Sequence, residues 1–262
     1  MLEVCNPWRH CQFKLHTFRS SLFHSASITI ERLFVAIEGS SELFTVFPVF
    51  LLVDVSASMA GGPIEALNAS LPDLKKEMMS NPTVGEIARV GLVTFSDQSR
   101  VVLPLCDLAF AEIPEVLIEG GTNFAAAFRG VRAAINDGMS KLPRGTPVCR
   151  PVVFFMSDGE HTAREDWRAP LAAVRDQTWR FSPELVTFGF GDANQQTIRE
   201  IATRYSFLAK EADPATQVRE ILNALIGSIR TTSTSFQDPN QAEGLHVEAP
   251  TKFFTPLPPI QL

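Results

Sequence analysis

Short apolar runs alternate along the chain with longer segments in which apolar residues recur every three or four positions. An unbroken apolar run bounded by polar residues is typical of a strand buried on both faces of a parallel sheet. Spacings of three and four predict amphipathic helices that pack on such a sheet. The runs lie at 48–53, 89–96, 151–157, 185–190 and 206–209, and the helical spacing at 64–78, 124–139, 171–177 and 218–229. Strands and helices that alternate in this way predict a doubly wound α/β fold, with a mostly parallel open sheet flanked by helices.

Local signals refine this plan. Asp97 and Gln98 form a short turn, after which residues 100–105 return as one antiparallel edge strand. Pro72 lies inside the first helical pattern and predicts a kink or break there. Asp213 directly precedes Pro214, which predicts a helix N-cap followed by proline at the first helical position.

The two ends of the chain differ from its middle. Residues 1–46 show no sustained period, and we expect a poorly structured N-terminal extension; one hypothesis places it upstream of the natural start. Residues 47–232 carry the whole α/β pattern and are expected to form one domain. Residues 233–262 are rich in proline and are expected to be a solvated tail, since they hold too little apolar surface to fold alone. A P-x-x-P match at 256–259 does not change that interpretation.

Composition and charge exclude several function classes. The net charge is -6 and no block of lysine and arginine occurs, which argues against nucleic-acid binding. The four cysteines contain no C-x-x-C pair and are expected to be reduced thiols. No apolar stretch reaches the roughly 20 residues of a membrane span, and the first residues lack a signal-peptide pattern. We therefore expect a cytoplasmic protein.

Oxygen-bearing side chains follow the ends of the predicted strands. Asp54, Ser56 and Ser58 come directly after the run at 48–53, Asp158 follows the run at 151–157, and Thr122 precedes a helix. Taken singly, each would be an ordinary turn or helix-cap residue. Together they belong to loops expected at one edge of the sheet, the carboxyl edge, where α/β folds bind ligands. Two carboxylates and three hydroxyls suit Mg²⁺ or Mn²⁺ rather than zinc.

This ligand set also suggests a mechanism. Three neutral hydroxyls neutralise little of the charge of a divalent cation, so an open coordination position would attract a carboxylate from a partner protein. Gly120 and Gly121, beside Thr122, would let that loop move as the last ligand changes.

The pattern Asp54-x-Ser56-x-Ser58, with Thr122 and Asp158, resembles the metal-ion-dependent adhesion site of von Willebrand factor A domains. The resemblance covers about 47–230, and Ala57 stands where the commoner motif has glycine. It implies that Ser56 and Ser58 are direct ligands and that Asp54 acts mostly through water and hydrogen bonds to its loop. Thr122 and Asp158 would exchange direct and water-mediated contact.

Four stretches also look like the bacterial TerY-like group: PVFLLVDVSASMAGGPIEALN, VGLVTFSD, EGGTNFAAAF and VVFFMSDGEHT. That resemblance implies a cytoplasmic protein of tellurium-resistance or chemical-stress gene clusters, with a protein kinase and a metal-dependent phosphatase as partners. An alternative keeps the fold and makes the chain an assembly subunit of an AAA+ chelatase-like complex. An extracellular adhesin is a weaker alternative.

An enzyme is the alternative from another class. A strand that ends in Asp beside Mg²⁺ also occurs in haloacid-dehalogenase phosphatases, but Ser56 stands where their general acid would be. Glu160 and His161 are the remaining candidates for base and acid. We therefore predict a non-enzymatic, metal-dependent protein-interaction module.

Overall fold

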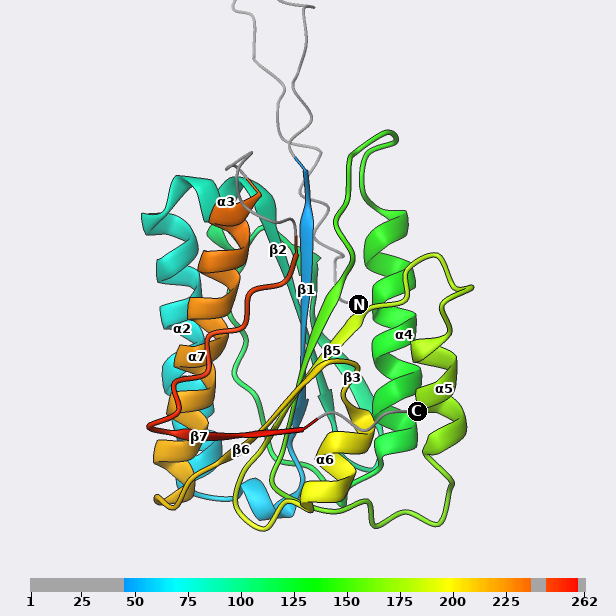
Figure 1. The fold of residues 1–262 in the computed structure, drawn as a ribbon, viewed down its shortest axis with the longest axis vertical. Helices are drawn as coiled ribbons and strands as arrows, with labels where there is room; N and C mark the ends of the chain where they lie inside the picture. Colours follow the sequence, from blue (N-terminus) through cyan, green and yellow to red (C-terminus); the bar gives the residue numbers. More distant parts are fainter. Residues whose placement is uncertain (1–44, 237–243, 259–262) are drawn as a thin grey trace, which may run out of the picture. The chain divides into compact units, whose positions relative to one another are not determined.

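Residues 45–236 and 244–258 are described by the computed structural model, and they form one seven-stranded sheet with helices on both faces (Figure 1). The strand order is β3-β2-β1-β4-β5-β6-β7. The strands are β1 Phe47–Asp54, β2 Ala88–Phe95, β3 Ser99–Cys106, β4 Val152–Ser157, β5 Glu184–Gly189, β6 Tyr205–Ala209 and β7 Phe254–Leu257. The helices are α2 Gly62–Ser80, α3 Pro82–Ile87, α4 Phe124–Ser140, α5 Arg168–Arg175, α6 Gln195–Ile201 and α7 Pro214–Ser235, with short 3₁₀ turns η1 Ala57–Met59 and η2 Leu108–Phe110. The predicted fold class is confirmed.

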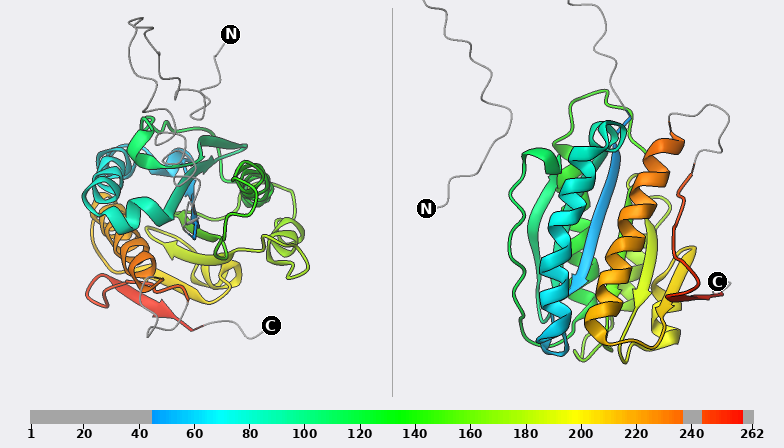
Figure 2. Two further views of the ribbon diagram at one scale, coloured as in Figure 1. Left: turned by 90° about the horizontal axis from the view of Figure 1, so that it is seen from above. Right: turned by 90° about the vertical axis from the view of Figure 1, so that its left-hand side faces the viewer.

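Strand β1 lies at the centre of the sheet and divides the core in two. All eight of its residues are buried. Val49, Leu51 and Val53 pack toward α2, α3 and α7, whereas Phe50 and Leu52 pack toward α4, α5 and α6. This alternation follows from the two-residue period of a strand. Helices α2 and α7 lie side by side on their face of the sheet (Figure 2).

Both edges of the sheet are antiparallel. Strand β3 pairs antiparallel with β2, as the sequence predicts. At the opposite edge β7 pairs antiparallel with β6, which the sequence analysis does not predict. The expectation of a solvated tail from 233 onward is therefore wrong for β7. Its two apolar ends, Phe254 and Leu257, are buried, and Phe254 packs edge-on against Phe188 of β5. Proline is tolerated at Pro256 because β7 is an edge strand.

Two further details differ from expectation. Helix α2 runs without a break through Pro72, since Leu71 and Leu74 beside it are buried and hold both halves against the core. Helix α7 continues to Ser235, past the predicted domain boundary at 232. The predicted extension at 1–46 lies outside the described residues except for Thr45 and Val46. No described helix is both long and apolar enough to cross a membrane.

Candidate metal site

The candidate site lies at the carboxyl edge of β1, the central strand. Asp54 is the last residue of β1, which pairs in parallel with β2 on one side and β4 on the other. The loops that leave these three strands therefore start next to one another. Asp54 and Ser56 are buried, Asp158 is half-buried and Ser58 is exposed, so the polar cluster extends from the core to solvent.

The carboxylate of Asp54 organises the first loop from inside the protein. Its Oδ1 accepts a hydrogen bond from the Ser56 backbone N–H at 2.9 Å, and its Oδ2 accepts one from Ser157 Oγ at 2.6 Å. Burial raises the pKa of Asp54 from 3.8 to about 6, although the hydrogen bonds from Ser157 and Ser56 oppose this rise. A buried carboxylate of this kind is stabilised by a nearby cation.

A chain of side-chain hydrogen bonds joins the first loop to the loop after β4. Ser56 Oγ lies 3.0 Å from Ser58 Oγ, and Ser58 Oγ donates to Asp158 Oδ1 at 2.8 Å. Burial raises the pKa of Asp158 above its usual value, and the hydrogen bond from Ser58 opposes the rise. Within the described part of the chain no lysine or arginine forms an ion pair with either carboxylate.

Thr122 completes the predicted set. The N-cap of α4 is Asn123, whose side chain accepts from the Ala126 N–H, so Thr122 is not the helix cap. A Cβ atom added to Gly159 would lie 3.7 Å from Thr122 Oγ1 and 4.0 Å from Ser58 Oγ. The two hydroxyls therefore face the same small space beside Gly159. All five predicted side chains are brought to one edge of the sheet.

The Thr122 loop is held against its neighbours by backbone hydrogen bonds. The Ala57 N–H donates to the Gly120 carbonyl at 3.0 Å, and the Thr162 N–H donates to the Thr122 carbonyl at 2.9 Å. Thr162 Oγ1 in turn accepts from the Thr122 N–H at 3.1 Å. The loops after β1 and β4 therefore both fix the position of Thr122.

Close approach to Asp97 explains why glycine stands at position 120. A Cβ atom there would lie 2.0 Å from Asp97 Oδ2, and the backbone of Gly120 has a φ of +32°. Both features disfavour any side chain. The predicted mobility of this loop stays a prediction, but the fit against Asp97 is a second reason for its glycine.

The donor set fits a hard divalent cation. Every candidate ligand is an oxygen atom, and two of them are carboxylates whose raised pKa values show that burial disfavours their charge. Across the described residues no group of three or more His, Cys, Asp or Glu side chains is placed to hold a metal ion. Hydroxyls must therefore supply part of any coordination shell here, as Mg²⁺ and Mn²⁺ allow and zinc disfavours.

Several supporting residues were missed by the sequence analysis. Ser157 and Thr162 each form a hydrogen bond with a site residue, Asp54 and Thr122 respectively. Asp97 packs against Gly120, in the loop that holds Thr122. Only Ser157 had a signal in the sequence, since it ends the apolar run directly before Asp158; the observed register, which pairs Val53 with Met156, then places Ser157 beside Asp54. The other two act through loop contacts that no sequence period reveals.

The two residues considered for acid–base chemistry have structural roles. The Phe124 N–H donates to His161 Nδ1 at 3.1 Å, and His161 Nε2 lies 2.6 Å from the Glu165 carbonyl. Glu160 is exposed and accepts from Asn194 at 2.8 Å. Both ring nitrogens of His161 are thus engaged in fixing the start of α4 and the loop that follows β4.

Comparison with known proteins finds a match to the part of the chain that contains the candidate site. Residues 49–161 match the family model described as von Willebrand factor type A domain. The chain is 28% identical over 179 residues to the mouse (Mus musculus) "Sushi, von Willebrand factor type A, EGF and pentraxin domain-containing protein 1", and 27% identical over 174 residues to the rat (Rattus norvegicus) protein of that name. These matches cover 64% and 62% of this chain but only 4% of each relative.

Solved structures share the fold at low sequence identity. Proximal thread matrix protein 1 from the mussel byssus, in a form described with a zinc-occupied MIDAS motif, has a TM-score of 0.52 and 17% identity, with 73% of this chain and 49% of that chain covered. The pilus adhesin SpaC from Lactobacillus rhamnosus GG has a TM-score of 0.53 and 15% identity, with 71% and 30% covered. A von Willebrand factor type A protein from Catenulispora acidiphila gives 0.51 and 15%, with 71% and 43% covered. The described chain therefore has the fold of a von Willebrand factor type A domain.

Proposed function

We propose that this chain is a non-enzymatic protein-interaction module that requires a divalent cation, Mg²⁺ or Mn²⁺, at Asp54, Ser56, Ser58, Thr122 and Asp158. The observation that carries the proposal is that two carboxylates, whose pKa values are raised by burial, and three hydroxyls converge at one edge of the sheet. The fold and the family-model match support it, because the matched stretch, residues 49–161, contains all five side chains.

The exposure of the site favours a cation that binds a partner over a buried cation with a purely structural role. Asp54 is buried beneath the loop, whereas Ser58 is exposed and Asp158 is half-buried. A cation among these side chains would keep one side toward solvent. With three neutral ligands it would stay electrophilic, and the carboxylate of a partner Asp or Glu would complete its coordination.

The surroundings give little support to hydrolysis. A phosphatase of the haloacid-dehalogenase kind needs an acid two residues after its nucleophile, and Ser56 cannot donate a proton as a carboxylic acid does. His161 uses both ring nitrogens in hydrogen bonds to the backbone. The enzyme alternative would gain support only from turnover with Mg²⁺ or Mn²⁺ that Asp54→Ala abolishes.

Capture of partners from cell extract with and without chelator tests the proposal. The full chain should retain a partner in Mg²⁺, release it in EDTA, and bind it again when Mg²⁺ is restored. Ser56→Ala should abolish capture, because it removes one hydroxyl ligand from a buried position without adding bulk. Ser80→Ala, on the exposed end of α2, is the matched control and should bind normally. Capture that is insensitive to both EDTA and Ser56→Ala would contradict the proposal.

A narrower version of the proposal follows from the TerY-like stretches of the sequence. It makes the chain a cytoplasmic component of a tellurium-resistance or stress-response complex, with a protein kinase and a metal-dependent phosphatase as partners. In the alternative, the partner is an AAA+ ATPase of a chelatase-like complex. Identification of the Mg²⁺-dependent partner by mass spectrometry separates the two: a kinase or phosphatase supports the first, an AAA+ protein the second.

A further inference from the structure

An arginine-rich hollow lies at the opposite edge of the sheet from the metal site. It has a volume of about 790 Å³ and is lined by residues from α5, α6, the first position of β5 and the segments that precede β4, β5 and β6. Strand β4 runs from one edge to the other, and its six residues span about 20 Å. The hollow is therefore distinct from the candidate metal site. Its charged lining residues are Arg150, Arg168, Arg175, Arg204, Glu184 and Glu200.

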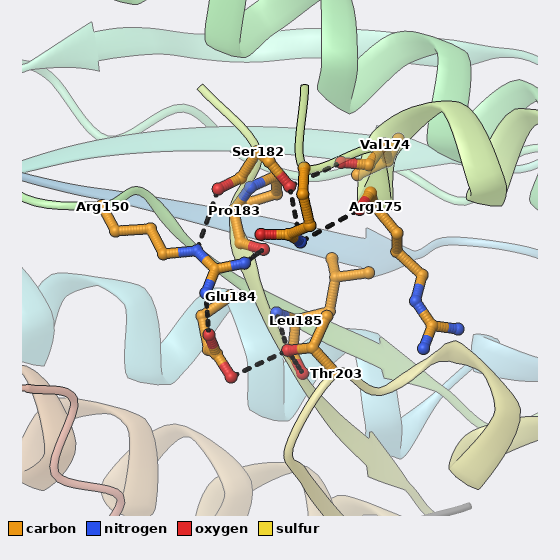
Figure 3. Close-up of polar contacts among 9 residues, drawn as sticks. Arg150, Val174, Arg175, Ser182, Pro183, Glu184, Leu185 and Thr203 are labelled. Atoms are coloured by element: carbon orange, nitrogen blue, oxygen red, sulfur yellow. Dashed lines mark hydrogen bonds and ion pairs between the residues drawn. The ribbon is translucent and has the colours of Figure 1, made fainter. Parts of the chain in front are cut away.

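Two of the four arginines are neutralised by the two glutamates. Arg150 forms an ion pair with Glu184 at 2.8 Å and also donates to the carbonyls of Ser182 and Pro183 (Figure 3). The other oxygen of Glu184 accepts from Thr203 Oγ1 at 2.9 Å, so this carboxylate has partners at both oxygens.

The second pair is bidentate. Arg168 donates to the two carboxylate oxygens of Glu200 at 2.6 and 3.1 Å. These two pairs use both carboxylates of the hollow, and two positive charges are left over.

The remaining arginines, Arg175 and Arg204, form no ion pair within the described part of the chain. Arg175 donates one hydrogen bond, to the Glu200 carbonyl at 2.9 Å, and its guanidinium extends away from the Arg150–Glu184 network (Figure 3). Burial lowers the pKa of Arg175, which the charge of Glu200 offsets only in part. Arg204 is exposed, with its guanidinium 5.0 Å from the centre of the Tyr205 ring.

We propose that this hollow binds the dianionic phosphoryl group of a phosphate monoester, with Arg175 and Arg204 as its direct ligands. A phosphate monoester carries a charge of about −2 at neutral pH, which matches the two unpaired guanidinium groups; a single carboxylate would neutralise only one. The planar guanidinium also donates in the forked geometry that phosphate oxygens accept. The volume exceeds that of a phosphoryl group and leaves room for the organic part of the ester.

Isothermal titration calorimetry of the full chain tests this proposal with three probes: inorganic phosphate, glucose 6-phosphate and a phosphoserine peptide. At least one is expected to bind with a dissociation constant of about 1 mM or tighter. The stronger binder of the two esters identifies the source of the phosphoryl group, a small molecule or a peptide. Failure of all three probes would overturn the proposal, as would equal affinity for acetate.

Variants locate the binding. Arg204→Gln removes an exposed side chain without an ion pair, so it should leave the fold intact and weaken phosphate binding about tenfold or more. Arg175→Lys keeps the charge but removes the fork and should weaken binding by a smaller factor. Arg144→Ala, an exposed arginine in the turn after α4, is the matched control for loss of one positive charge and should bind normally. Unchanged affinity in Arg204→Gln and Arg175→Lys would contradict the assignment.

Binding at this hollow is independent of the proposed metal site. All titrations are repeated in EDTA and with Ser56→Ala, where phosphate affinity should be unchanged. Loss of phosphate binding under either condition would place the anion at a metal ion instead and refute the proposal.

Discussion

Replacing Asp54 with asparagine is expected to stabilise the metal-free protein while destroying its cation site. The Asp54 carboxyl is fully buried, and its pKa rises from 3.8 to about 6. Each unit of pKa corresponds to about 1.4 kcal/mol, so at pH 7.5 the ionised carboxylate costs the folded state about 3 kcal/mol. Asparagine is uncharged and of similar size, and its oxygen can still accept from the Ser56 N–H. We expect a gain of about 2 to 3 kcal/mol, or roughly 5 to 10 °C in Tm.

The sign of the pH dependence follows from the same shift. Because the folded-state pKa is raised, the unfolded state loses its proton first, and the stability of the metal-free protein falls as pH rises from about 4 to about 6. Above pH 6 the full cost is present, and at pH 5 about half of it remains. The advantage of Asp54→Asn should therefore be about half as large at pH 5 as at pH 7.5.

Urea unfolding in EDTA at both pH values measures this effect. The matched control is Asp73→Asn, an exposed carboxylate on α2, which should change the free energy of unfolding little at either pH. Mg²⁺ at 1,000 times the dissociation constant should reverse the order of stability, since only the parent protein gains binding energy, about 4.1 kcal/mol. A metal-free Asp54→Asn protein that is less stable than the parent, or whose advantage does not change with pH, would refute the reasoning.

Three further predictions address the loops, the metal and the edge strand. Cation affinity measured by calorimetry should fall about tenfold per pH unit below about pH 6, because binding must displace a proton from Asp54; a flat profile would contradict this. Gly120→Ala should weaken cation binding about tenfold or more, because the added Cβ clashes with Asp97. Gly145→Ala is the control: Gly145 also has a positive φ, but its added Cβ meets no atom within 4 Å, so this variant should bind the cation normally. Equal affinities of the two variants would argue against the Asp97 contact. Phe254→Ala should lower the free energy of unfolding, measured in urea, by about 3 to 5 kcal/mol, since Phe254 is buried in β7. Phe110→Ala should lower it little, because Phe110 is 87% exposed. Similar losses in the two variants would argue against β7 as part of the core.

The layout of the central sheet could be predicted because each buried strand is a continuous apolar run. Strand β7 could not, since FTPL has only two buried side chains, at its two ends, and contains a proline. Its place in the sheet depends on contacts of Phe254 with aromatic residues about 50 and 70 positions earlier, Phe207 and Phe188. A local sequence pattern cannot reveal a contact between residues so far apart in the chain. The continuity of α2 through Pro72 has the same origin, because burial of its neighbours outweighs the local preference of proline.

The sequence predicted the five candidate metal ligands but not the residues that support them. Asp54, Ser56 and Ser58 stand at fixed spacing after an apolar run, so the sequence displays them directly. Ser157, at the end of β4, and Thr162, in the loop that follows β4, contact the site from another part of the chain, and their partners become visible only when the strand register and the loop contacts are known. Convergence of the five predicted side chains is observed, and their role as metal ligands stays a prediction.

Anomalous diffraction from crystals soaked in Mn²⁺ tests the central claim most directly. The proposed site predicts a strong anomalous peak about 2.0 to 2.3 Å from the hydroxyl oxygens of Ser56 and Ser58, with Thr122 or Asp158 as a further ligand and an open position toward solvent. The peak should be absent from Ser56→Ala crystals and present in Ser80→Ala crystals. A Mn²⁺ peak elsewhere in the parent protein, with none among these side chains, would contradict the claim.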